Sequence, residues 1–309
     1  MSTIFTPNAI TAGMKALLVR AMRGIEMQSL IPMLAQFRPT NVLTQDYSLV
    51  GDTETMEVVG DGGVIYAPVR DDTIRVTSRT FARGIKISQD SLRYDQTGQV
   101  ADRINRLARA AVAHANSLLI TQITNGTTYN AALRPTMDDV AFFHTAHPIQ
   151  MAEGATQSNI VTQTGVTTAA IATDFATALS RLQGFVAHNS EPYHENPSEL
   201  LVLASPDNRR AFLEALTGQI LSNTSNVQAS GLNLQLHFTA RLTGNPWYLS
   251  VRGPSDMLPL AFQESKPVSP EVMDPNVSDE SFDHRVVKAK VEGQYEALYN
   301  QWQSMIRVA

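Results

Sequence analysis

The chain has 309 residues, a formal net charge of −5 and no cysteine, so it is long enough for one large domain or two modest ones. The missing cysteine excludes disulfides, cysteine-ligated zinc and thiol catalysis. The negative charge argues against a dedicated nucleic-acid binder, whose affinity rests on clustered Lys and Arg. No apolar run is long enough to predict a membrane span, and residues 1–7 do not have the pattern of a secretory signal.

The first segment, residues 8–36, carries apolar residues at close to helical spacing, and we expect Pro32 and Pro39 to break that pattern. The segment is therefore predicted to be a docking helix followed by an extended arm. A helix lying on a membrane surface is a weaker alternative. Its basic face would consist of Lys15, Arg20 and Arg23.

Residues 47–88 have a strand pattern, with turn residues at Gly60–Gly63. Within Thr73–Phe81, alternation places Ile74 and Val76 on one face. The opposite face carries Arg75, Thr77 and Arg79. Two long strands with a glycine-rich tip bury little by themselves, so we expect this hairpin to lie on a neighbour.

The clearest predicted helix follows, because apolar residues recur every three or four positions in one stripe. These residues are Val100, Ile104, Leu107, Ala111, Ala115, Leu118 and Ile123, with Gln122 beside them. Asp95 or Thr97 can cap the start, and Asn125–Gly126 is a typical stop. About 27 residues would span roughly 40 Å. Three arginines on the exposed side, Arg103, Arg106 and Arg109, are either a solvated face or a contact with a neighbouring subunit.

Residues 127–165 predict a long irregular segment, which in a compact domain is usually functional or bound to a partner. A second amphipathic helix is expected to open at Thr167 or Thr168. Its apolar positions are Ile171, Phe175, Leu179, Leu182 and Val186. A buried strand at Glu199–Ala204 and a helix at Asn208–Leu216 follow, an order that favours an α+β or α/β layer.

Residues 217–232 are small, polar and uncharged, as in a surface loop. We expect strands at Leu234–Thr239, Trp247–Val251 and Leu258–Gln263, then a connector. The connector is predicted from Pro267, Pro270 and Pro275. Residues 282–295 alternate like a final strand, and an aromatic segment ending at Trp302 follows it.

Two histidines three residues apart, His144 and His147, are the strongest candidates for chemistry, because this spacing can ligate zinc on one helical turn or a shaped loop. Glu153, His188 and His194 are also available. The flanking Pro148 does not favour a helix, so hydrogen bonding within an ordered loop, with Phe142 and Phe143 in the core, is the preferred interpretation. Gly60–Gly63 does not lead from a strand into a helix that begins with Lys and Ser or Thr, so it does not predict a nucleotide-binding loop. We therefore predict no catalytic residue, no metal and no cofactor.

Taken together, the order of three segments resembles the major head subunit of Mu-like tailed phages, which has the Hong Kong-type capsid fold. The segments are Ile85–Gly98, Phe142–Pro148 and Phe282–Trp302. The resemblance implies an α+β fold with a long spine helix. It assigns residues 1–46 to an N-terminal arm, 47–88 to an extended β-hairpin loop, 89–164 to a peripheral domain holding the spine helix, 165–270 to an axial domain and 271–309 to C-terminal return strands.

The resemblance also implies a function: a non-enzymatic major capsid protein that forms hexamers and pentamers of an icosahedral head, assembled in the host cytoplasm. Its implied partners are further copies of itself, packaged double-stranded DNA held without sequence recognition, and separate scaffolding, portal and decoration proteins. No membrane is implied. Two other hypotheses stay open. One is a metal-dependent hydrolase using His144, His147 and Glu153; the other is a different structural or adaptor protein of the same virion.

Overall fold

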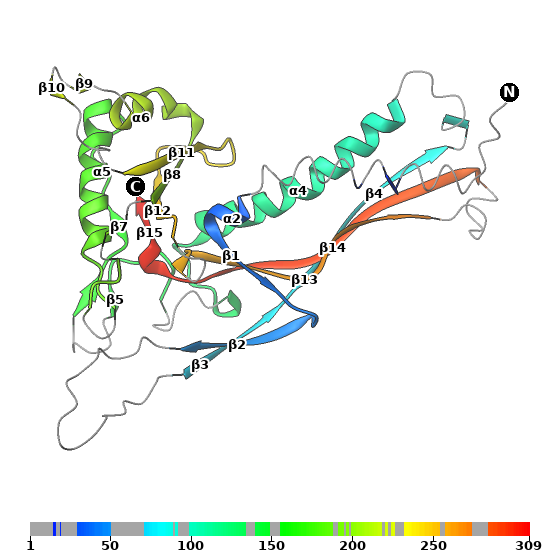
Figure 1. The fold of residues 1–309 in the computed structure, drawn as a ribbon, viewed down its shortest axis with the longest axis horizontal. Helices are drawn as coiled ribbons and strands as arrows, with labels where there is room; N and C mark the ends of the chain where they lie inside the picture. The colour runs from blue at the N-terminus through cyan, green and yellow to red at the C-terminus, as the bar shows by residue number, and fades with distance from the viewer. Residues whose placement is uncertain are drawn as a thin grey trace.

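The protein was analysed as a computed structural model. It describes residues 15–16, 19, 30–50, 71–88, 90–91, 99–133, 140–148, 155–187, 191–194, 196–197, 199–217, 220–221, 224–225, 232–253, 257–273 and 284–309. Figure 1 shows a long arm joined at one end to a rounded body, with a two-stranded hairpin projecting from the junction. The described part of the chain contains no helix long and apolar enough to cross a bilayer.

The arm is built on a four-stranded sheet in the order β1-β13-β14-β4. The strands are β1 (Ala35–Pro39), β13 (Leu260–Val272), β14 (Val286–Tyr299) and β4 (Arg79–Ser88). β1 pairs parallel to β13, whereas β14 runs antiparallel to both β13 and β4. The sheet therefore joins two strands from residues 35–88 to two strands from residues 260–299, near the other end of the chain (Figure 1).

The long helix α4 (Gln99–Asn125) lies along the β4–β14 side of this sheet, as the sequence predicts. Ile104, Leu107, Ala115 and Ile123 of its apolar stripe are buried, Ala111 and Leu118 are partly buried, and the three arginines are exposed. At its end Gly126 donates its backbone N–H to the carbonyl of Ile123. A Cβ at Gly126 would lie 2.8 Å from the Phe143 ring, so glycine is required there by close packing. The predicted caps Asp95 and Thr97 lie outside the described residues.

The expected connector through Pro267 and Pro270 is wrong, because both prolines lie inside β13. Proline cannot donate to a strand ladder. The register between β13 and β14 shifts between Glu264 and Lys266 and again between Lys266 and Ser269, on either side of Pro267. These irregularities let the strand continue past the proline. Pro275 lies outside the described residues.

The body contains a five-stranded sheet in the order β11-β8-β12-β15-β7. Its strands are β11 (Asn233–Phe238), β8 (Glu199–Ala204), β12 (Trp247–Val251), β15 (Met305–Val308) and β7 (Ile160–Val161). Residues 200–204 are all buried, as expected for a central strand covered on both faces. The C-terminal β15 lies between β12 and β7, so this part of the predicted return segment 271–309 belongs to the body sheet, whereas β14 belongs to the four-stranded sheet.

Helix α5 (Thr168–Gln183) packs on this sheet and against α6 (Arg209–Leu216), as Figure 1 shows. Thr167 caps α5 by accepting a hydrogen bond from the backbone N–H of Ala170, at 3.3 Å. Ser205 leads into α6 through a short 3-10 turn, Pro206–Asn208. The predicted order of helix, strand and helix is therefore confirmed, but Val186, which was expected in the first helix, lies beyond the end of α5 and forms an isolated β-bridge with Pro192. Aromatic side chains of α5, α6 and β12 fill the core, with Phe175, Phe212 and Trp247 fully buried.

The hairpin consists of β2 (Thr44–Val50) and β3 (Asp71–Thr77), which pair antiparallel. Ile74 and Val76 share one face as predicted, and that face packs on Ala261 and Leu298 of the same chain's arm sheet. Contact of the hairpin with a neighbouring chain stays a prediction. The predicted run through Phe81 is instead divided at Ser78, where the chain leaves the hairpin and enters β4. Gly60–Gly63 lies outside the described residues.

Near the N-terminus, Pro32 begins a helix rather than ending one. It occupies the first turn of α2 (Ile31–Leu34), where a missing N–H costs nothing because that donor would have no helical partner. Pro39 is the last residue of β1, as the expected break requires. Lys15, Ala16 and Val19 are helical, and the rest of the predicted helix before Leu30 lies outside the described residues.

The polar segment 217–232 is described only in part. Its described portion contains two short antiparallel strands, β9 (Ile220–Leu221) and β10 (Thr224–Ser225), at the top of the body in Figure 1. The loop is thus locally a small hairpin.

Candidate subunit-interaction surfaces

The histidine loop is organised by a buried asparagine that the sequence analysis did not single out. Asn159 is fully buried, and its side-chain amide donates to the carbonyls of Phe142 at 2.7 Å and Trp302 at 3.4 Å. Its Oδ1 accepts from the backbone N–H of His144 at 2.9 Å and lies 3.3 Å from Nε2 of His147. Because Oδ1 can only accept, Nε2 of His147 carries the hydrogen.

His147 is fully buried and stacks on Trp302 with ring centroids 3.9 Å apart and planes 6° apart. The ring of His144 meets it edge-on at 5.8 Å, and Nδ1 of His144 accepts from the backbone N–H of Ala146. Phe142 and Phe143 are buried in the core. The loop therefore has the hydrogen-bonded, packed arrangement that the sequence analysis preferred.

The residues proposed for a hydrolase are not brought together in the described structure. His194 is buried elsewhere, with Nε2 3.5 Å from Oγ of Ser304. Burial lowers the pKa of His194 to about 4. Glu153 and His188 lie outside the described residues. Among the described residues no three His, Asp or Glu side chains are placed to hold a metal ion.

Charged and aromatic side chains connect β4, β14 and α4 at the end of the arm nearest the body. Arg79 makes a bidentate ion pair with the buried carboxylate of Glu296, with N–O distances of 2.5 and 2.9 Å. This pair raises the pKa of Arg79. Beside it, Nδ1 of His114 on α4 lies 2.9 Å from the hydroxyl of Tyr295, and its ring contacts Phe81. Burial, followed by the positive charges of Arg79 and Arg241, lowers the pKa of His114.

Further along the arm, four charged side chains bridge the two strands around the irregular part of β13. Lys266 lies 3.3 Å from Glu271 and 2.9 Å from Glu292, and Lys290 lies 3.0 and 2.6 Å from the same two carboxylates. Hydrogen bonds from Lys290 and Lys266 lower the pKa of Glu292 to about 2. Two positive and two negative charges thus neutralise each other on the sheet.

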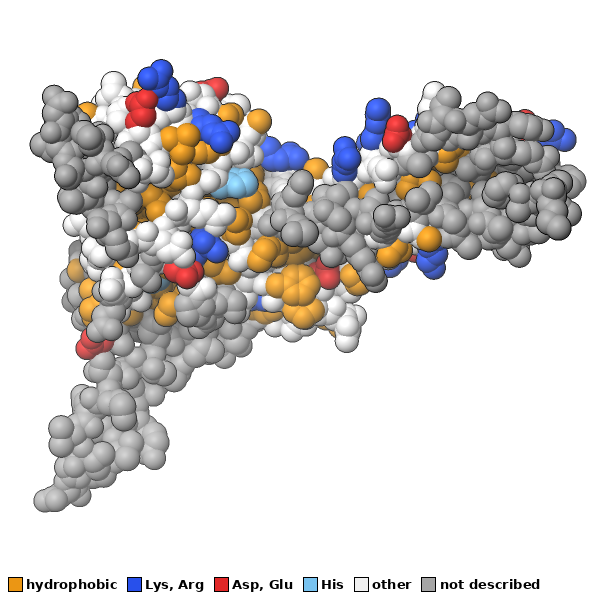
Figure 2. All heavy atoms as spheres, turned by 45° about the horizontal axis from the view of Figure 1, so that its top comes forward, with side chains coloured by type: hydrophobic (Ala, Val, Ile, Leu, Met, Phe, Trp, Pro, Cys, Tyr) orange, Lys and Arg blue, Asp and Glu red, His pale blue; other side chains and the backbone are white. Residues whose placement is uncertain are grey.

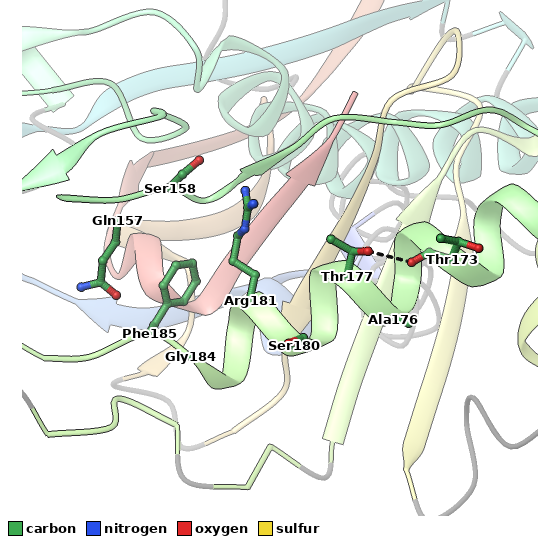
Figure 3. A pocket seen from close by; sticks show the side chains of 9 residues that line it. All are labelled: Gln157, Ser158, Thr173, Ala176, Thr177, Ser180, Arg181, Gly184 and Phe185. Atoms are coloured by element: carbon green, nitrogen blue, oxygen red, sulfur yellow. Dashed lines mark hydrogen bonds between the residues drawn. The ribbon is translucent and has the colours of Figure 1, made fainter.

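A groove of about 840 Å³ runs along the outer face of α5. Figure 3 shows its lining, which comes from α5 and from the segment that precedes β7. The lining residues are Gln157, Ser158, Thr173, Ala176, Thr177, Ser180, Arg181, Gly184 and Phe185. Thr173 and Thr177 donate their hydroxyls to backbone carbonyls four residues earlier. Their hydrogen bonds are satisfied within the helix, so small side chains line a surface that a neighbouring chain can approach closely.

The exposed hydrophobic side chains near the junction of arm and body come from β1 and the turn that follows it. Phe37, Val42 and Leu43 are 49%, 49% and 48% exposed. Figure 2 shows hydrophobic side chains in this part of the surface and several Lys and Arg side chains along the α4 side of the arm. The chain therefore presents a hydrophobic surface near the junction and a basic surface along α4.

An elongated arm of one long helix on a sheet, a rounded α+β body and a projecting hairpin define the Hong Kong-type capsid fold, a class of proteins that form virus shells. A family model described as phage capsid protein matches residues 71–308. The chain belongs to this phage capsid protein family, and it is a structural protein of the virion.

Solved structures show the same fold at low sequence identity. The procapsid of bacteriophage JBD30 aligns with a TM-score of 0.56 and 14% identity, covering 98% of this chain and 75% of that one. A virus-like particle from Pyrococcus furiosus aligns with a TM-score of 0.55 and 10% identity, covering 97% and 99%. The mature capsid of bacteriophage PhiM1 aligns with a TM-score of 0.55 and 10% identity, covering 91% and 86%. No curated protein matches the sequence.

Proposed function

We propose that this protein is the major capsid subunit of a Mu-like tailed phage and that it assembles into hexamers and pentamers of an icosahedral head. The family match over residues 71–308 carries the proposal. The low identity to the solved capsids supports the fold alone, and the Mu-like subgroup rests on the order of the three sequence segments. Assembly takes place in the host cytoplasm, and the head encloses double-stranded DNA without reading its sequence.

The subunit has no catalytic role in this proposal, and its partners are mainly further copies of itself. The ranges 1–46, 47–88, 89–164, 165–270 and 271–309 serve as arm, hairpin loop, peripheral domain, axial domain and return strands, with β15 completing the body sheet. Separate scaffolding, portal and decoration proteins complete the head. The hairpin and the small-residue groove of α5 supply contacts between neighbouring subunits, because both present surface that a second chain can cover.

Electron microscopy and sedimentation of the purified full-length chain test the proposal. Closed shells are expected, whereas a small closed oligomer with stoichiometric zinc by elemental analysis would favour the hydrolase. A solitary ring or a tube without closed shells would favour an adaptor protein of the virion.

The α5 groove gives a sharper prediction. Replacing Ala176 by arginine places a long charged side chain where a neighbour is expected to pack. The site is exposed, and arginine is a good helix former, so the isolated subunit should fold normally. A loss of about 1.4 kcal/mol of binding free energy at a contact between subunits weakens that contact tenfold. We therefore expect at least a tenfold rise in the protein concentration needed for assembly.

The matched control is Gln183→Arg, which adds the same charge to an exposed position of α5 outside the groove lining. Light scattering over a concentration series measures both variants, and circular dichroism checks their folding. Equal assembly thresholds for the two variants would show that the groove is not covered in the shell.

A further inference from the structure

The arginines of α4 form a row of positive charge that has no ion-pair partner among the residues that the structure describes. Arg103, Arg106 and Arg109 are all exposed. Within the described residues, none of the three guanidinium groups has a hydrogen bond or an ion pair. α4 also holds one acidic residue, Asp102, in its first turn. Like charges three residues apart repel each other on a helix, so this row reduces the stability of the isolated subunit.

On the opposite face of the same arm, charged side chains are paired with one another. There Lys266 and Lys290 are each paired with both Glu271 and Glu292, so their charges cancel. On one face of the arm, positive and negative side chains thus pair with each other. On the helical face, the three arginines have no such partner among the described residues. In a chain with a net charge of −5, an open basic row is a local exception. An anion from outside the described residues would offset the repulsion between these arginines.

The kind of anion follows from how the row is presented. Successive arginines rise about 4.5 Å along the helix and turn around it, and no neighbouring group fixes any of their side chains. A binding site for one particular carboxylate would hold its guanidinium groups in place beforehand. Unfixed arginines suit a partner whose negative charges repeat continuously, and double-stranded DNA carries one charge per about 1.7 Å of its axis.

We propose that the α4 face of the arm is the surface of the subunit that meets packaged double-stranded DNA, through contacts of Arg103, Arg106 and Arg109 with backbone phosphates. The inference rests on the proposed capsid function, and it adds which face of the arm is turned towards the interior of the shell. The contacts carry no sequence information, because phosphates position a protein on DNA without specifying bases.

Salt dependence of DNA binding tests the inference. The full-length chain and the variant R103Q/R106Q/R109Q are titrated, unassembled, against a fluorescent 20-base-pair duplex of random sequence at several salt concentrations. Each phosphate contact contributes about 0.9 to the slope of log K against log salt. We expect the slope of the variant to be smaller by about 2 to 3. Glutamine keeps helix propensity close to that of arginine, and circular dichroism checks the helix.

Two further variants sharpen the result. R209Q/R210Q/R252Q removes the same charge from the body, and its slope should stay near that of the parent. R103K/R106K/R109K keeps the charge and should keep the slope. An unchanged slope for the glutamine variant of α4 overturns the inference. If that variant also fails to form shells, the row meets an acidic surface of another subunit instead. Shell formation by the parent chain is scored separately by electron microscopy, so failure of the capsid function itself is distinguishable.

Discussion

Replacing Asn159 by alanine is expected to lower the free energy of unfolding by about 3 kcal/mol. The substitution leaves the buried carbonyl of Phe142, the N–H of His144 and Nε2 of His147 without their partner. Each buried polar group left unsatisfied costs about 1–3 kcal/mol. The loss should appear as a lower urea midpoint with an unchanged dependence on urea concentration, measured on unassembled subunits by tryptophan fluorescence.

Thr162→Ala is the control for this prediction, because Thr162 is an exposed neighbour of β7 and should change stability by less than about 0.5 kcal/mol. Asn159→Asp keeps an oxygen that can accept from the backbone N–H of His144 and from Nε2 of His147, but it lacks the amide N–H donor. Its loss of unfolding free energy should therefore lie close to that of Asn159→Ala once the cost of the buried charge is included. A loss below about 1 kcal/mol for Asn159→Ala would mean that the loop is not held by this residue.

Acid is expected to destabilise the subunit through His194. Burial lowers its pKa to about 4 in the folded chain, whereas the unfolded value is about 6.5. Between these values the unfolded chain binds more protons, so stability falls as the pH drops. The contribution is fully present above pH 6.5 and is lost progressively down to about pH 4. A shift of this size corresponds to up to roughly 3 kcal/mol.

Urea unfolding of unassembled subunits between pH 7.5 and 4 measures this effect. The difference in stability between the parent and His194→Gln should shrink as the pH falls from 6.5 to 4. His237→Gln is the matched control, because His237 is a half-buried histidine whose pKa is also lowered by burial. A difference between parent and His194→Gln that does not change with pH would show that His194 is hydrated in the folded subunit.

Elements with a strong local pattern were predictable from sequence. The stripe of α4 identifies the arm helix because every third or fourth residue is apolar from Val100 to Ile123, and Leu200–Ala204 identifies a central strand because it is apolar throughout. The division at Ser78 was missed because that side chain is buried by distant partners, Gln263 and Ser265. Alternation alone cannot reveal such contacts.

The histidine loop was predictable only in part. Phe142 and Phe143 are two adjacent aromatics, which favour burial, and Pro148 argues against a helix. Asn159 gave no signal, because an asparagine that follows polar residues, here Gln157 and Ser158, is typical of a turn. Its role depends on Trp302, 143 residues later in the chain. The prolines of β13 were misleading for a similar reason, since the irregular pairing that accommodates them is set by the partner strand β14.

The position of β15 has a consequence for biosynthesis. This strand, Met305–Val308, lies inside the body sheet between β12 and β7, so the sheet is divided into two parts until residues 305–308 have left the ribosome. Domains generally fold as units during synthesis, but this body cannot close early. A subunit that presents a finished body therefore carries an arm whose strand β14 has already been made. A product truncated before Met305 therefore lacks the strand that joins the two parts of the body sheet.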